Sequence, residues 1–177
     1  MQSKQLLQEL STLTRQIIAQ AENLQQAKPE LLSRQPGPGS WSALECLEHL
    51  NLYADFYIPQ IARSIQQSNT RPEAEFNSGW LGNYFAESMM PKQQLNRMKT
   101  FANKNPLNAP LDKEVITRFI AGQHQLLQLL EQAGQVSLNK VKISTSIASF
   151  IRIRLGDTLR FVIYHNQRHL LQAQRAL

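Results

Sequence analysis

The sequence predicts an all-α fold, a four-helix bundle with a long irregular connection between helices two and three. Two observations lead to this prediction. Apolar residues recur at spacings of three and four in four long segments, which is the period of one helix face. Clusters of breaker residues or long irregular connections separate these segments. The helices are predicted at residues 2–27, 42–68, 112–133 and 157–176. Because such helices bury their apolar faces against one another, residues 1–177 are expected to form one domain.

The first helix carries the most regular apolar stripe: Leu6, Leu10, Leu13, Ile17, Ala21 and Leu24. A breaker cluster of alternating proline and glycine follows at residues 36–39. The second helix is expected to begin at Ser42, because Ser42 and Glu45 have the spacing of a capping box. Pro59 lies inside this helix and should kink it, since proline removes one backbone hydrogen bond.

Residues 69–111 form the irregular connection. Four prolines interrupt this segment: Pro72, Pro91, Pro106 and Pro110. Short helical pieces are predicted at residues 80–86 and 91–100. A connection of this length in a compact domain is usually functional or partly disordered, so this segment is a candidate lid or rim for a site.

The third helix is expected to have Asp112 as its N-cap and Gly134 as its stop. Apolar and polar residues alternate at 141–143 and again at 151–155, which is the period of extended chain. Two isolated short stretches do not make a stable sheet alone, so we interpret them as an extended connection lying over the bundle.

The last helix is predicted to follow a break at Gly156, with Asp157 as its N-cap. It carries His165 and His169, one turn apart, with Cβ atoms about 6 Å from each other. Apolar neighbours such as Phe161 indicate that the pair points inward. A buried imidazole without a partner carries a desolvation cost, and one metal ion would satisfy both rings. The alternative is a pair of core histidines satisfied by ordinary hydrogen bonds.

Two residues compete as a third ligand. His49 on the second helix shares a face with Glu45 and Tyr53, whereas His124 on the third helix lies between two glutamines. Glu45 is either a partner that orients His49 or a capping-box residue. Cys46 is a candidate thiolate ligand, but small buried cysteines usually just pack. Zinc, nickel and iron(II) all accept neutral imidazole.

These residues resemble a known family. The pattern WSxxExxxHL at residues 41–50, the Tyr57-Ile58-Pro59 sequence, and residues 155–161 and 165–170 look like the DinB-like superfamily. The resemblance is close over residues 41–61 and 155–175. It implies a four-helix bundle that binds a divalent metal through one histidine of the second helix and two of the fourth. By position these are His49, His165 and His169.

The resemblance also implies a class of chemistry. Some members are similar to transferases that use low-molecular-weight thiols such as bacillithiol, mycothiol or glutathione. We therefore expect a divalent-metal-dependent enzyme (Zn, Ni or Fe) that activates a small thiol, as an S-transferase, or water, as a hydrolase. Its substrate would be a small molecule. The alternative is a non-catalytic metal-binding or stress-response bundle. No general base stands out, and His124 and Glu45 are only candidates for that role.

The composition of the chain narrows the classes of protein to which it could belong. No apolar run approaches the roughly 18 residues of a membrane span, and the first residues lack the apolar core of a signal peptide. With one cysteine no intrachain disulfide can form, so we expect a cytoplasmic protein. The residues behind the net charge of +6 are scattered and no recognised motif accompanies them, so no nucleic acid is expected as a partner. Arg160 and Arg168 are expected to face solvent, although an arginine at the rim of the site could hold an anionic substrate. A homodimer would be indicated by an exposed apolar stripe on one helix.

Overall fold

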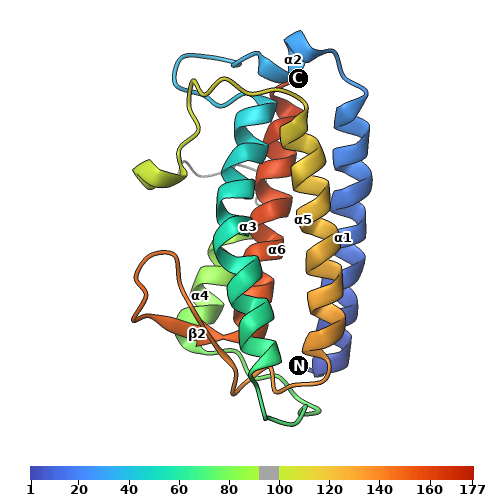
Figure 1. Cartoon of the computed structure of the whole chain (residues 1–177), viewed down its shortest axis with the longest axis vertical. Coiled ribbons are helices and arrows are strands. Elements are labelled where there is room, and N and C mark those ends of the chain that lie inside the picture. The colour runs from blue at the N-terminus through green and yellow to red at the C-terminus, as the bar shows by residue number, and fades with distance from the viewer. Residues whose placement is uncertain (92–99) are drawn as a thin grey trace.

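The computed structural model describes residues 1–91 and 100–177, and it is mostly helical (Figure 1). The helices are α1 (Ser3–Gln25), α2 (Pro29–Ser33), α3 (Ala43–Gln66), α4 (Trp80–Met89), the 3₁₀ turn η1 (Ala102–Lys104), α5 (Glu114–Ala133) and α6 (Leu155–Arg175). Two short strands complete this part of the chain, β1 (Lys142–Ser144) and β2 (Arg152–Arg154). Most of the expected helical piece at residues 91–100 lies outside the described residues.

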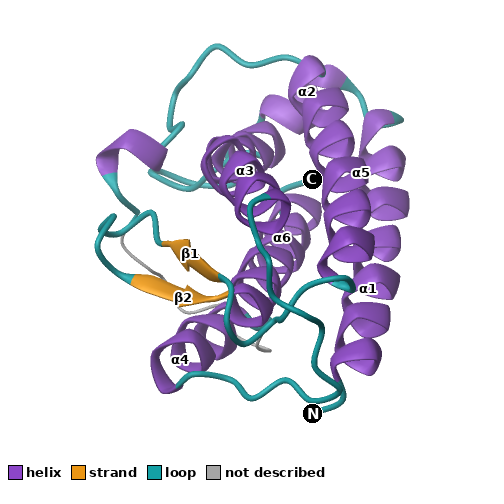
Figure 2. Ribbon diagram, turned by 60° about the horizontal axis from the view of Figure 1, so that its bottom comes forward, coloured by secondary structure: helices purple, strands orange, loops and turns teal. Residues whose placement is uncertain are grey.

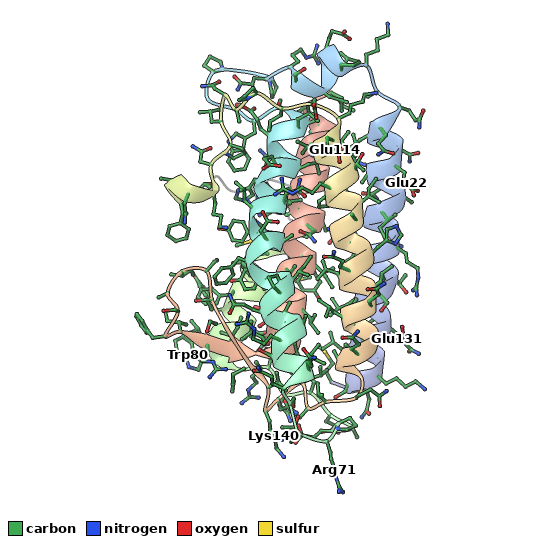
Figure 3. All side chains as sticks on the ribbon, in the orientation of Figure 1. Glu22, Arg71, Trp80, Glu114, Glu131 and Lys140 are labelled. Atoms are coloured by element: carbon green, nitrogen blue, oxygen red, sulfur yellow. The ribbon has the colours of Figure 1, made fainter. Side chains whose placement is uncertain are left out.

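The four long helices α1, α3, α5 and α6 run beside one another (Figure 1). Helices α1 and α3 each pack against both α5 and α6, so the apolar stripes meet in a common core. Leu6, Leu10 and Ile17 of α1 are each 1% exposed, as the periodicity predicts. Charged residues such as Glu22, Glu114 and Glu131 lie on the outer faces of α1 and α5 (Figure 3).

Helix α3 begins as predicted. The hydroxyl of Ser42 accepts the N–H of Glu45 at 3.2 Å, and the Glu45 carboxylate accepts the N–H of Ser42 at 2.7 Å. Both halves of the capping box are therefore present. Pro59 lies inside the helix, which continues to Gln66.

The expectation for residues 135–155 was wrong in one respect, because the two extended stretches pair with each other. Strands β1 and β2 form an antiparallel two-stranded sheet in which Ile143 lies opposite Ile153 (Figure 2). Both isoleucines are buried, and the sheet packs against α3, α4 and α6. A two-stranded sheet is marginal alone, so this packing against helices is what stabilises it.

The start of α6 also differs from the prediction. The helix begins at Leu155, so Gly156 and Asp157 lie in its first turn rather than before it. Gly156 is not a break: a Cβ there would lie 2.5 Å from Cε2 of Phe76, so the absence of a side chain lets that ring pack against the helix.

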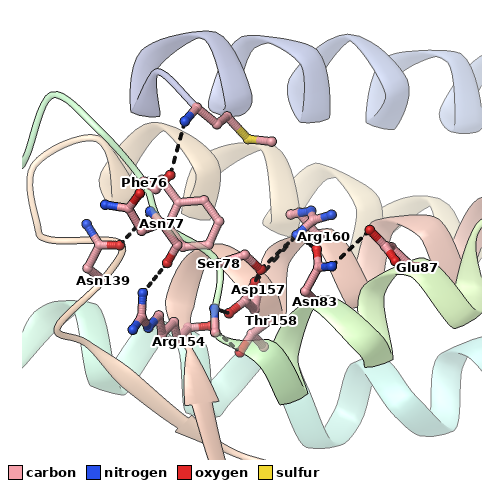
Figure 4. A network of polar contacts seen from close by, with 12 residues as sticks. Phe76, Asn77, Ser78, Asn83, Glu87, Asn139, Arg154, Asp157, Thr158 and Arg160 are labelled. Carbon is pink, nitrogen blue, oxygen red and sulfur yellow. Dashed lines mark hydrogen bonds and ion pairs between the residues drawn. The ribbon is translucent and has the colours of Figure 1, made fainter.

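Asp157 caps a helix other than its own. Its carboxylate accepts the N–H of Gly79 at 2.9 Å and the hydroxyl of Ser78, at the N-terminus of α4 (Figure 4). A carboxylate suits this position because helix N-termini carry unsatisfied N–H groups and a partial positive charge. Asp112 is likewise not the N-cap of α5, which is Lys113, although its carboxylate accepts the N–H of Glu114 at 2.9 Å.

Arg160 and Arg168 are buried, contrary to the expectation that they face solvent, and are 6% and 4% exposed. The guanidinium of Arg160 donates to Ser78 at 3.0 Å and Asn83 at 2.9 Å, and it pairs with Asp157 at 3.5 Å. Ser78 and Asn83 are distant from Arg160 in the sequence, which is why local sequence could not reveal the burial of Arg160. Helix α4 is thus fastened to α6 by a charged network. No helix in the described part of the chain has the length and apolarity needed to cross a membrane.

Candidate metal centre

Helix α6 presents two imidazoles to the interior. His165 is 4% exposed, His169 is half-buried, and their ring centroids lie 4.7 Å apart. The 3.6-residue period of the helix places them on one face, beside the packed ring of Phe161. The inward orientation predicted for this pair is therefore correct.

Helix α3 adds the third histidine. The ring centroid of His49 lies 5.1 Å from that of His165 and 4.7 Å from that of His169. The closest nitrogens, Nε2 of His49 and Nε2 of His165, are 3.2 Å apart. Each residue of the trio offers one ligand nitrogen, and these three atoms lie within 4.8 Å of one another. Of the two rivals, His49 joins the pair, whereas His124 lies exposed on α5.

The spacing of these nitrogens fits one ion. Tetrahedral zinc with bonds of about 2.0–2.1 Å separates its ligand nitrogens by about 3.3 Å. The 3.2 Å between Nε2 of His49 and Nε2 of His165 matches that separation, and all three ligand nitrogens lie within 4.8 Å of one another. The trio can therefore hold a divalent metal ion.

Burial keeps the trio neutral. Desolvation lowers the pKa of His49 to about 4 and that of His169 to about 3. The pKa of His165 is also lowered well below its usual value, first by burial and then by repulsion from the other two rings. Neutral imidazoles can offer the lone pairs that a metal requires, so near pH 7 no imidazolium has to be deprotonated before an ion binds.

Hydrogen bonds fix which nitrogen of His49 is free. Nδ1 of His49 lies 2.7 Å from the backbone carbonyl oxygen of Lys104. A carbonyl only accepts, so Nδ1 carries the proton and Nε2 presents its lone pair to the trio. In the same way Nδ1 of His169 lies 2.9 Å from the amide oxygen of Gln172. This leaves Nε2 of His169 free as well.

Glu45 and Cys46 are not ligands of this trio. Glu45 serves the capping box and does not orient His49, a task that falls to the carbonyl of Lys104. Cys46 is completely buried, and burial raises the pKa of its thiol to about 12. It is therefore a protonated packing residue, as small buried cysteines usually are.

Aromatic rings enclose the histidines. The ring of Trp41 lies 4.7 Å from that of His49, and the ring of Tyr53 lies 4.9 Å from it. Sequence reasoning placed Tyr53 on the face of His49 but gave neither ring a part in the site. The ammonium of Lys104 lies 5.5 Å from the Tyr53 ring. No local pattern marks Lys104, because it comes from the irregular connection.

The fold and the trio together define a helical protein with a buried histidine cluster suited to a divalent metal. A family model, described as the DinB superfamily, matches residues 4–173. The chain therefore belongs to the DinB superfamily, as the motifs around His49 and His165 indicate. A search of curated proteins found no match, and neither did a search of solved structures.

Proposed function

We propose that this protein is a metal-dependent enzyme in which His49, His165 and His169 hold one divalent ion. The observation that carries the proposal is the convergence of three neutral imidazoles from two helices within 4.8 Å. We further propose that α1, α3, α5 and α6 form the four-helix bundle of a single domain built around this site.

Three histidine ligands leave a coordination position for a reacting molecule. A divalent ion bound there would lower the pKa of a coordinated thiol or water and make a nucleophile near neutral pH. Among the described residues, no carboxylate or thiolate joins the trio to close its coordination. The thiol reaction, an S-transfer to a small electrophile, is favoured by the family resemblance, and hydrolysis is the water counterpart.

Side chains around the trio would shape the reaction site and exclude water from it. Trp41 and Tyr53 cover the imidazoles with apolar surface, which excludes water and strengthens electrostatic interactions inside. His169 is the most exposed of the trio, so a small substrate would approach from its side.

The second candidate is a non-catalytic metal-binding or stress-response protein. The deep burial of His49 and His165, 3% and 4% exposed, favours it, because a structural ion needs no access. The two candidates differ in the coordination shell. An exchangeable fourth ligand supports the enzyme, and a closed protein shell supports the structural role.

Metal affinity of histidine variants tests the ligand assignment. His49→Ala, His165→Ala and His169→Ala should each cost several kcal/mol of zinc or nickel affinity, because each removes one of three protein–metal bonds. His124→Ala is the matched control and should bind like wild type, since His124 lies exposed on α5. Isothermal titration on tag-free protein measures both. Loss of binding in His124→Ala with retention in His49→Ala would refute the assignment.

Turnover tests the catalytic part. The metal-loaded protein should accelerate conjugation of a low-molecular-weight thiol to an electrophile, or hydrolysis of a small ester or amide. The rate should fall to background in His165→Ala. A metal-loaded wild type that does neither across such a panel favours the non-catalytic candidate.

A further inference from the structure

Residues 104–108, which we name the strap, cross the N-terminal part of α3 beside the histidine trio. The strap begins at Lys104, the last residue of the 3₁₀ turn η1, and ends before α5. Beyond Lys104 it contains no helix or strand, so side-chain contacts must hold its backbone in place. Those contacts come from four residues in or before α3: Gln35, Trp41, Glu45 and His49.

The middle of the strap is fastened by Trp41. The indole N–H of Trp41 donates to the side-chain oxygen of Asn105 at 3.1 Å. The same oxygen accepts the backbone N–H of Leu107 at 3.3 Å, which holds the strap in a turn. The indole ring also packs on His49, at 4.7 Å between centroids. One side chain therefore touches both the strap and the candidate ligand.

The far end of the strap is fastened by Glu45. Its carboxylate accepts the backbone N–H of Asn108 at 2.6 Å, in addition to its capping-box bond. The amide of Gln35 donates to that carboxylate at 2.9 Å and to the side-chain oxygen of Asn108 at 3.1 Å. Asn108 has a φ of 62°, a left-handed conformation that asparagine tolerates better than most residues.

The near end of the strap makes the contact that matters for a metal. The carbonyl of Lys104 accepts the Nδ1 proton of His49 at 2.7 Å, while the ammonium of Lys104 donates to the carbonyl of Leu52. Neutral imidazole has two tautomers, and only the one with a proton on Nδ1 leaves Nε2 free. Nε2 is the atom that faces His165.

We propose that the strap selects the metal-binding tautomer of His49, and that Trp41 and Asn105 are positioning residues that hold the strap for this purpose. The proposal rests on the assignment of His49 as a metal ligand. A ligand imidazole whose other nitrogen is held by an acceptor binds more tightly, and losing such a partner typically costs about 10–100-fold in metal affinity. By linkage, a bound metal strengthens docking of the strap by the same factor.

The contact between the strap and Trp41 can be followed by tryptophan fluorescence. The chain has two tryptophans, and Trp80 is 83% exposed on α4, so Trp80→Phe leaves Trp41 as the sole emitter at little structural cost. In that background, Asn105→Ala removes the acceptor of the Trp41 N–H. Asn103→Ala, on the exposed face of η1, is the matched control. Three readouts are compared: zinc affinity against a competing chelator, Trp41 emission, and the His49 tautomer from ¹⁵N NMR of metal-free protein.

Asn105→Ala should lose about 10-fold or more in zinc affinity, red-shift the Trp41 emission and reduce the Nδ1–H tautomer of His49. Asn103→Ala should change none of these. Wild-type zinc affinity together with an unchanged tautomer in Asn105→Ala overturns the proposal. If Asn105→Ala fails to fold, Trp41→Phe removes the donor while leaving a smaller aromatic ring at position 41, and it is judged by affinity and tautomer. Failure of wild type to bind zinc refutes the proposed function instead, and the metal-free NMR comparison still decides the role of the strap.

Discussion

Each histidine of the trio is neutral in the folded protein at a pH where a free imidazole would begin to take up a proton. Burial lowers the pKa of His49 to about 4 and of His169 to about 3, against about 6.5 in an unfolded chain. Below pH 6.5 the three histidines bind protons in the unfolded chain but stay unprotonated in the folded chain. Acid therefore favours unfolding through these residues before most carboxylates titrate.

The first prediction is a pH dependence of the metal-free protein. Its free energy of unfolding should be greatest above pH 6.5 and fall as the pH drops toward about 4, by at most about 1.4 kcal/mol per pH unit for each histidine. Urea unfolding in chelator at pH 7.5, 6.0 and 5.0 measures the slope. Hydrogen bonds from Ser137 and Asn139 lower the pKa of Glu73 to about 2. The stability that Glu73 contributes is therefore lost only below about pH 4.5, outside the range of the histidines.

A variant that lacks one of the three histidines is the control for the pH dependence of the unfolding free energy. His169→Gln removes one titrating group, so the curve between pH 6.5 and 4.5 should be flatter than that of wild type. A slope unchanged in His169→Gln would show that other groups cause the loss. A stability that stays constant from pH 7.5 to 5.0 in wild type would contradict the lowered pKa values themselves.

At the scale of single elements, α4 depends on close contact with α6. A Cβ placed on Gly82 would lie 2.5 Å from Cγ of Asp157, which is fully buried and caps α4. Arg160, one turn further along α6, also binds Ser78 and Asn83, so the two helices are tied together at this contact (Figure 4). The glycine is therefore required by packing, although glycine lowers intrinsic helix stability.

Two glycine-to-alanine changes should consequently have opposite signs. Gly82→Ala should destabilise the protein by about 1–3 kcal/mol, the usual cost of overpacking. Gly122→Ala should stabilise it by up to about 1 kcal/mol, because a Cβ there meets only Ile58 and Ala54 at 3.7 and 3.9 Å. Urea denaturation of both variants tests this. Equal effects of the two changes would mean that the contact with Asp157 relaxes freely.

The sequence could predict the long helices, because their apolar spacing and capping residues are local patterns. The stripe through Leu6 and Leu10 and the Ser42 capping box place helices almost to the residue, because both signals are local. The one-turn spacing of His165 and His169 is local in the same way, whereas the preference for His49 over His124 rests chiefly on the family resemblance. The pairing of β1 with β2 and the strap contact at Lys104 depend on residues far apart in sequence, so no local pattern could reveal them.

On the scale of the whole molecule, the trio joins two helices that are far apart in the sequence, α3 and α6. His49 lies 116 residues before His165, and α3 contacts α6 along the core. The first residue of the chain is also tied to a distant segment: the terminal ammonium of Met1 donates to the backbone carbonyl of Phe76, whose ring packs on Gly156. An ion at the trio would bind only the folded arrangement, so its binding free energy adds to folding stability.

Metal should therefore raise the melting temperature. At a free zinc concentration of about 100 times the Kd the gain is about 2.7 kcal/mol, or roughly 5–10 °C for a chain of this size. Excess chelator should reverse the shift. The gain should vanish in His49→Ala and persist in His124→Ala, as thermal scans with and without zinc can show. An equal gain in His49→Ala would place the stabilising ion elsewhere.

The buried thiol of Cys46 has a practical consequence for assays of S-transfer. With its pKa raised to about 12, it is almost wholly protonated at pH 7–8, and thiols react as thiolates. A disulfide reagent should therefore detect no thiol in the native protein and one after denaturation. Alkylating electrophiles can then be offered as co-substrates without alkylation of Cys46. The consumption of electrophile would therefore contain no contribution from a thiol of the protein itself.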